Sequence, residues 1–110
     1  MSFSNSADTE LLKSILEPLL DDFQYWFGRS LVFLESHELS FMTSDQQSDL
    51  LARVTQAKQE VTAAQSLFQA TSGLVGVEMA ALAPWHRLVF ECWQVVNRFH
   101  RESAGDTPGA

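Results

Sequence analysis

At 110 residues the chain is long enough for one compact domain, which would bury about two-thirds of its unfolded surface. Hydrophobic residues make up 45% of it, with five glycines and three prolines, which indicates a folded, mostly helical domain and excludes a disordered chain or a β-sandwich. The formal net charge of −7 disfavours nucleic acid and anionic membrane surfaces as partners, because both are negatively charged.

The single cysteine and the N-terminal residues indicate a cellular location. One cysteine allows no internal disulfide, which suits a reducing compartment. The first residues lack the basic start and apolar run of a signal peptide. No window approaches the roughly 18 uninterrupted apolar residues that a bilayer requires. We therefore expect a cytoplasmic protein without a membrane span.

The first periodic segment predicts a helix from about residue 9 to residue 36, with Asp8 or Thr9 capping its first turn. Apolar residues recur there at intervals of three and four, and a second set widens the apolar side to about half the circumference. The first set is Leu12, Leu16, Leu19, Phe23 and Trp26, and the second is Leu11, Ile15, Leu20, Phe27, Leu31 and Leu34. Pro18 predicts a kink near that residue, or a helix that starts there.

The second helix is predicted over residues 44–71. Ser44 and Gln47 match a capping box, in which the serine hydroxyl bonds the Gln47 amide and the Gln47 side chain returns to the serine amide. Gly73 is placed to end the helix. The apolar residues form a narrow, regular seam suited to close packing. They are Leu50, Val54, Ala57, Val61, Ala64 and Phe68.

The third helix is predicted over residues 76–102, with a break at Pro84, which would be the first residue of the main helix after a short preceding turn or helix. Residues 103–110 are expected to form a flexible tail. Three helices joined by short loops predict an all-α, up-down-up three-helix bundle within residues 1–102. An open hairpin completed by a second chain is the alternative.

The segment from Pro84 to Arg101 combines histidines, a carboxylate and the only cysteine, and a helical projection separates them. Cys92 falls at the centre of the apolar face, so we expect a buried thiol with a raised pKa. His86 and Glu91 point away from it on opposite sides, so the helix by itself builds neither a metal site nor a thiolate–imidazole pair. The apolar face comprises Trp85, Leu88, Val89, Cys92, Val95, Val96 and Phe99.

A polar stripe, in which Arg87 and Glu91 are spaced for a weak surface pair, lies opposite that apolar face. A mixed aromatic and polar flank lies between the two. It comprises His86, Phe90, Trp93, Asn97 and His100. Because a bundle core needs only about a third of a helix's circumference, these rings are candidates for partner binding. Alternatively, the first helix covers them.

Tyr25 and Arg29 extend the candidate partner surface to the first helix. They are spaced i to i+4 and away from its apolar side, so they form a local stacking pair or join the contact surface. Glu-x-x-His, His-x-x-x-His and Gly-rich phosphate-loop motifs do not occur. We therefore predict no catalytic, metal or cofactor residues and a protein that is not an enzyme.

Several runs resemble a family of short cyanobacterial proteins that is classed as a domain of unknown function. They are Thr9 to Lys13, Leu16 to Phe27, Asp49 to Val54, Pro84 to His86 and Glu91 to Val95. The resemblance covers about residues 9–101. It implies a cyanobacterial source and carries no activity, cofactor or catalytic residue with it.

These observations predict a non-enzymatic helical protein-interaction module, an assembly or regulatory factor, whose partner is another protein or a second copy of the chain. The alternative is a carrier bundle for a flat apolar ligand such as a tetrapyrrole. His86 or His100 would then be an axial ligand, or Cys92 an attachment point.

Overall fold

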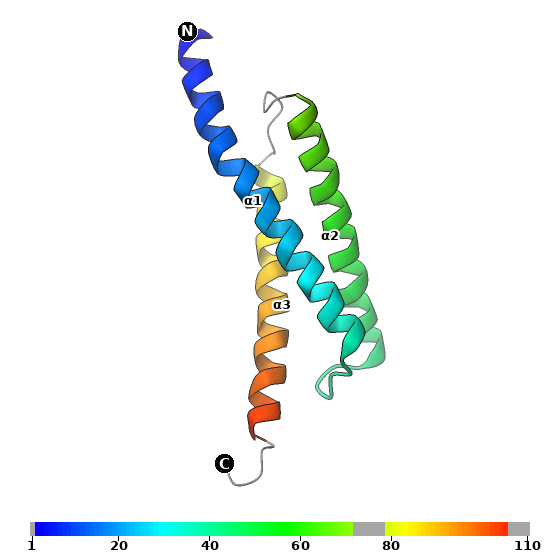
Figure 1. The fold of residues 1–110 in the computed structure, drawn as a ribbon. Helices are drawn as coiled ribbons and strands as arrows, with labels where there is room; N and C mark the ends of the chain where they lie inside the picture. The colour runs from blue at the N-terminus through cyan, green and yellow to red at the C-terminus, as the bar shows by residue number, and fades with distance from the viewer. Residues whose placement is uncertain (1, 72–78, 106–110) are drawn as a thin grey trace.

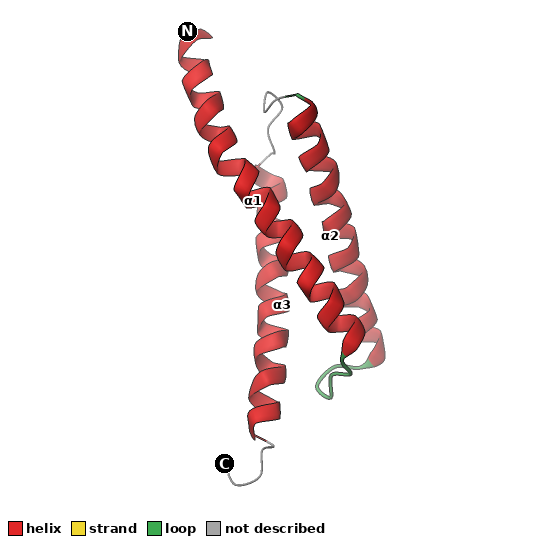
Figure 2. Cartoon of the chain, viewed as in Figure 1, coloured by secondary structure: helices red, strands yellow, loops and turns green. Residues whose placement is uncertain are grey.

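The computed structural model describes residues 2–71 and 79–105, and the side chains of residues 10–71 and 82–103. These residues form three helices and no strand: α1 (Ser2–Ser36), α2 (Ser44–Ala70) and α3 (Met79–Gly105). The chain runs along α1, returns antiparallel along α2 and reverses again in α3 (Figures 1 and 2). Helix α1 packs against both others. The predicted all-α, up-down-up three-helix bundle is therefore confirmed.

Both proline-based predictions of a helix start are wrong. Helix α1 begins at Ser2 and runs through Pro18, and α3 begins at Met79 and runs through Pro84. Each proline removes one backbone hydrogen bond, but buried side chains on both of its sides hold the helix to its neighbours. These are Leu16 and Leu20 around the first proline, and Leu82 and Trp85 around the second.

The helix ends differ from the sequence prediction in two further places. Helix α1 begins at Ser2, so the predicted start near residue 9 with a cap at Asp8 or Thr9 is wrong, because the helix continues through both residues. Helix α3 continues to Gly105, so residues 103–105 are helical where a tail was expected. The remainder of the expected tail, the stop at Gly73 and the predicted start at residue 76 lie outside the described residues.

The capping box of α2 is present but lies one residue earlier than predicted. Thr43 is the cap: its Oγ1 accepts a hydrogen bond from the Gln46 amide at 3.0 Å, and Gln46 Oε1 accepts one from the Thr43 amide at 2.9 Å. Gln47 is thereby left for another role. Its Nε2 donates to the carbonyl oxygens of Leu34 at 2.8 Å and His37 at 2.7 Å, which satisfies acceptors at the end of α1.

The core contains the predicted faces of α2 and α3 and a narrower strip of α1. Of the α2 seam, five residues are buried and Ala64 is half-buried. On α3, Trp85, Leu88, Val89 and Cys92 are buried. Leu11, Leu12, Ile15 and Trp26 were expected on the apolar side of α1 but are exposed. The predicted side spans about half the helix, and the described parts of α2 and α3 cover less than that.

Polar contacts fix α1 against α2 and α2 against α3. Lys58 Nζ donates to Gln24 Oε1 at 2.8 Å, and Gln24 Nε2 donates to Thr62 Oγ1 at 2.6 Å. On the other side of α2, Trp85 Nε1 donates to Glu60 Oε1 at 3.1 Å. These bonds set the register of the helices around the apolar core.

The molecule is long and thin. Its Cα radius of gyration is 18.0 Å, with principal extents of 65 × 29 × 19 Å, whereas a compact domain of this length has a radius of about 13 Å. An elongated bundle leaves more apolar surface uncovered than a compact one does. Within the described residues, no helix combines the length and apolar character needed to cross a bilayer.

Candidate interaction surface

Four aromatic side chains from α1 and α3 form an exposed group, which we call the aromatic face. Tyr25 is 53% exposed and Trp26 38%, while Phe90 is 60% exposed and Trp93 44%. Trp26 joins the two helices: its ring meets Tyr25 edge-on at 5.1 Å and Trp93 edge-on at 5.3 Å between centroids. Phe90 lies one helical turn before Trp93. The aromatic face therefore continues across two helices.

All five residues of the predicted flank on α3 are exposed: His86, Phe90, Trp93, Asn97 and His100. The alternative, in which the first helix covers them, is wrong for Phe90 and holds only in part for Trp93, which Trp26 touches at one edge. His86 packs edge-on against Phe23 at 5.0 Å, close to the core rather than against the aromatic face.

Tyr25 and Arg29 form the local pair that their spacing predicts. Arg29 Nη1 donates to the Tyr25 hydroxyl oxygen at 2.9 Å, and the guanidinium carbon lies 5.7 Å from the ring centroid. Among the described residues no carboxylate pairs with Arg29. Its charge is therefore available beside the aromatic face.

A groove of about 530 Å³ runs between α1 and α3 at the edge of the aromatic face. It is lined by Trp26, Arg29, Ser30, Phe33, His37, Trp93, Val96, Asn97 and His100. The groove brings together Arg29, Trp93, Asn97 and His100 of the predicted site, while Tyr25, His86 and Phe90 lie outside its lining. Aromatic walls with a few polar groups are typical of ligand-binding clefts.

His37 belongs to the groove, and the sequence analysis missed it. Its Nδ1 lies 3.0 Å from the Phe33 carbonyl oxygen, and because a carbonyl only accepts, Nδ1 carries the proton in this bond. The ring stacks on Phe33 at 4.5 Å and meets Phe99 edge-on at 4.8 Å. The signal was present in the sequence: continued past Ser36, the helical projection places His37 beside Trp26 and Phe33.

Cys92 is buried, as predicted, with 2% of its surface exposed. Burial raises the pKa of its thiol, and a hydrogen bond with Ser30 opposes that shift without reversing it. A buried neutral thiol is a poor nucleophile. The expected alternative role of Cys92 as an attachment point therefore has no support in the geometry.

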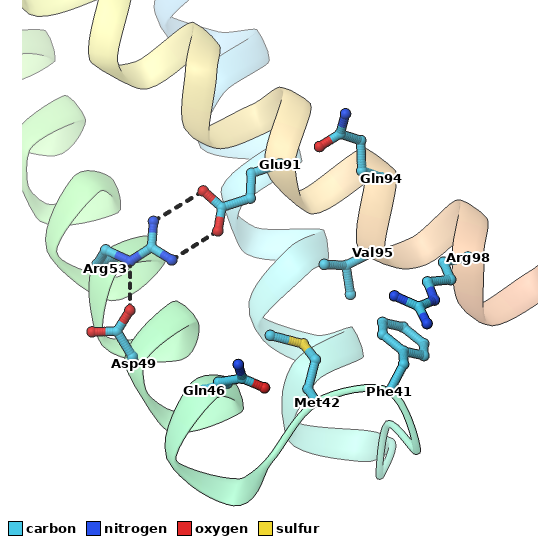
Figure 3. A pocket seen from close by; sticks show the side chains of 9 residues that line it. All are labelled: Phe41, Met42, Gln46, Asp49, Arg53, Glu91, Gln94, Val95 and Arg98. Atoms are coloured by element: carbon cyan, nitrogen blue, oxygen red, sulfur yellow. Dashed lines mark hydrogen bonds and ion pairs between the residues drawn. The ribbon is translucent and has the colours of Figure 1, made fainter.

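The predicted pair between Arg87 and Glu91 is wrong, because Glu91 binds Arg53 of α2 instead. Arg53 donates from Nη1 and Nη2 to the two Glu91 oxygens at 3.0 and 2.8 Å, and from Nε to Asp49 Oδ2 at 2.9 Å (Figure 3). This forked geometry is stronger than a single contact along one helix. The Arg53 guanidinium lowers the pKa of Glu91, and Glu91 raises the pKa of Arg53.

The Arg53 fork lies in a cleft of about 410 Å³ between α2 and α3, which is also lined by Phe41 and Arg98. The Arg98 guanidinium carbon lies 4.4 Å from the Phe41 ring centroid, and Figure 3 shows the two side chains together. Most charged groups of this cleft are already paired, so it is a weaker candidate for binding than the aromatic face. No group of three or more His, Cys, Asp or Glu residues within the described part of the chain could hold a metal ion.

Fold and surface together define an all-α three-helix protein with an aromatic face across α1 and α3. The chain belongs to the family described as protein of unknown function (DUF2605), whose family model matches residues 6–101. Searches of curated proteins and of solved structures found no match. The family description assigns no activity.

Proposed function

We propose that the protein is a non-enzymatic helical interaction module that presents its aromatic face to a protein partner, as an assembly or regulatory factor. The supporting observation is the exposure of Tyr25, Trp26, Phe90 and Trp93 on one continuous surface. Tryptophan, tyrosine and arginine are the residues most enriched where interfaces gain their binding energy. Arg29 beside these rings completes that composition.

We also propose a cytoplasmic location and a cyanobacterial source. The location is supported by the single cysteine, which is a buried free thiol and suits a reducing compartment. The source is supported by the resemblance of the sequence runs described above.

The proposal is tested by the double variant F90A/W93A. Because both side chains are substantially exposed, we expect it to fold, with a loss in the free energy of unfolding of about 1 kcal/mol, mostly from the lost contact between Trp93 and Trp26. Capture of partners by the tagged wild-type protein from a lysate of the source organism should be strongly reduced in the variant.

Two controls make the result specific. W85A removes a buried tryptophan and should lower the free energy of unfolding by about 3–5 kcal/mol. This value is the reference for losing an aromatic ring from the core. L67A truncates an equally exposed apolar side chain on α2 and should leave capture unchanged. If F90A/W93A unfolded like W85A, those rings would belong to the core and the proposal would fail.

The second candidate function is a carrier for a flat apolar ligand, for which a tetrapyrrole is the model. The groove between α1 and α3 favours it, because it combines tryptophan walls with Arg29, His37 and His100. A guanidinium can bind a carboxylate, and an imidazole can be an axial ligand to haem iron. His86 lies outside the groove and Cys92 is buried, so the proposal uses neither His86 as an axial ligand nor Cys92 as an attachment point.

Titration of the purified protein with haemin, followed by absorbance, tests this second function. We expect a shifted Soret band that is lost in H37A or H100A and kept in H86A, the matched control outside the groove. Iron-free protoporphyrin separates apolar binding from iron ligation. Absence of any spectral change with either porphyrin would remove the carrier function.

A further inference from the structure

The side of α1 that faces away from α2 and α3 carries a second seam. Its residues recur at alternating intervals of four and three, and every one is exposed: Leu11, Ile15, Pro18, Asp22, Tyr25, Arg29, Val32 and Ser36. In Figure 1, α1 crosses in front of α3. An interval of 3.5 residues is the pattern with which one helix packs along another.

Two opposite charges lie symmetrically within this seam. Asp22 and Arg29 are seven residues apart, about 10.5 Å along the helix, so the spacing does not favour a pair within one chain. Neither forms an ion pair with any described residue. The midpoint between them falls between Tyr25 and Trp26. Each residue therefore lacks an opposite charge, which a symmetric copy could supply.

We propose that the partner on this surface is a second copy of the chain, with the two α1 helices antiparallel about a two-fold axis at that midpoint. The rotation sets each residue opposite the one equally far from the midpoint on the other copy. Asp22 then faces Arg29, and Tyr25 faces Trp26. The inference rests on the proposed function, because it names the occupant of the α1 part of the aromatic face, Tyr25 and Trp26.

The same rotation matches apolar side chains further out. Val32, which is 65% exposed, falls opposite Leu19, which is half-buried at the edge of the core. Trp93 lies beside Trp26 in each copy, so the α3 rings flank the central contact. Every residue of the seam is exposed, so this side of α1 is accessible from Leu11 to Ser36. The two charges and the central rings are thus self-complementary about one axis, whereas Ile15 at the other end of the seam falls opposite Ser36.

Charge reversal provides the test, because a two-fold interface doubles every charge. In D22R each copy presents arginines at positions 22 and 29, so each arginine faces an arginine of the other copy. In R29D each copy presents two aspartates, which face each other in the same way. Like charges at such a contact weaken association on the order of a hundredfold. By analytical ultracentrifugation in about 0.15 M salt, where distant charges are screened, we expect the wild type to be a dimer and each single variant a monomer.

The decisive samples combine the two reversals. An equimolar mixture of D22R and R29D should form a heterodimer, since each copy then supplies the charge that the other lacks. The double variant D22R/R29D should dimerise by itself. E35R makes the same charge change as D22R on an exposed position of α1 away from the seam, and it should remain dimeric. Far-UV circular dichroism of every variant should match that of the wild type.

Three results would overturn the inference: a wild type that is monomeric at all concentrations, single variants that remain dimeric, or a mixture that fails to associate. A monomeric wild type whose partner capture still depends on Phe90 and Trp93 would leave the proposed function intact and remove only the second copy. The two proposals therefore fail in distinguishable ways.

Discussion

At the scale of single residues, Cys92 offers the most direct check of the bundle, because its thiol reports on opening of the core. It is 2% exposed at the centre of the apolar face of α3. We expect a thiol reagent such as 5,5′-dithiobis(2-nitrobenzoate) to label the native protein only through opening, and the unfolded protein at the rate of a free thiol. Fast labelling of the folded protein would contradict this burial.

The pH dependence of the same thiol has a defined sign. Burial raises the pKa of the Cys92 thiol in the folded state. The contribution of this group to the free energy of unfolding is therefore fully present below the pKa of the unfolded thiol, about 8.5. As the pH rises beyond that value, the unfolded chain ionises first and stability falls. In C92A this alkaline loss should be smaller, which denaturant unfolding at neutral and alkaline pH measures.

At the scale of the elements, prediction succeeded where one helix face is narrow and regular. The seam of α2 follows strict intervals of four and three, so only one side can be buried, and Leu50, Val54 and Val61 are all fully buried. On α1 the apolar side is broad. Which part of it is covered depends on where α2 and α3 cross it, and periodicity along one helix does not contain that information.

For the start of α2, the sequence analysis predicted the correct capping motif at the wrong residue. Thr43 and Ser44 are adjacent, and each is followed three residues later by a glutamine, so either could begin the capping box. The choice of Thr43 is decided by the loop, because Gln47 is then free to donate to the carbonyls of Leu34 and His37. Such a bond joins residues more than nine positions apart and is not visible in a local motif.

The candidate interaction surface also has a part that one helix predicts and a part that depends on how two helices pack. The projection of α3 alone places Phe90 and Trp93 off its apolar face, but only the structure shows that α1 leaves them exposed. The groove requires α1 and α3 to lie side by side, which places Arg29 and His37 next to His100. The flank on α3 could therefore be predicted from the sequence, whereas its proximity to Arg29 and His37 could not.

At the scale of the whole molecule, burial is unevenly distributed, and local stability should follow it. Helix α1 packs more extensively with α2 than with α3. On α3 the buried side chains lie between Leu82 and Cys92, whereas Val95, Val96 and Phe99 further along are only half-buried. Amides open locally at a free energy set by the apolar contacts that hold them. The C-terminal half of α3 should therefore open before the rest.

Hydrogen–deuterium exchange read by peptide mass spectrometry measures this gradient. We expect peptides from residues 20–34 of α1 and 50–68 of α2 to exchange most slowly, and those from residues 93–103 at least about tenfold faster, which corresponds to a difference of about 1.4 kcal/mol in opening free energy. The proposed α1 pairing would slow exchange in α1 further and leave α3 beyond Trp93 unchanged, because the two-fold contact does not reach that part of the helix. Equal protection along α3 and α2 would mean that α3 is held by contacts beyond those of a single chain.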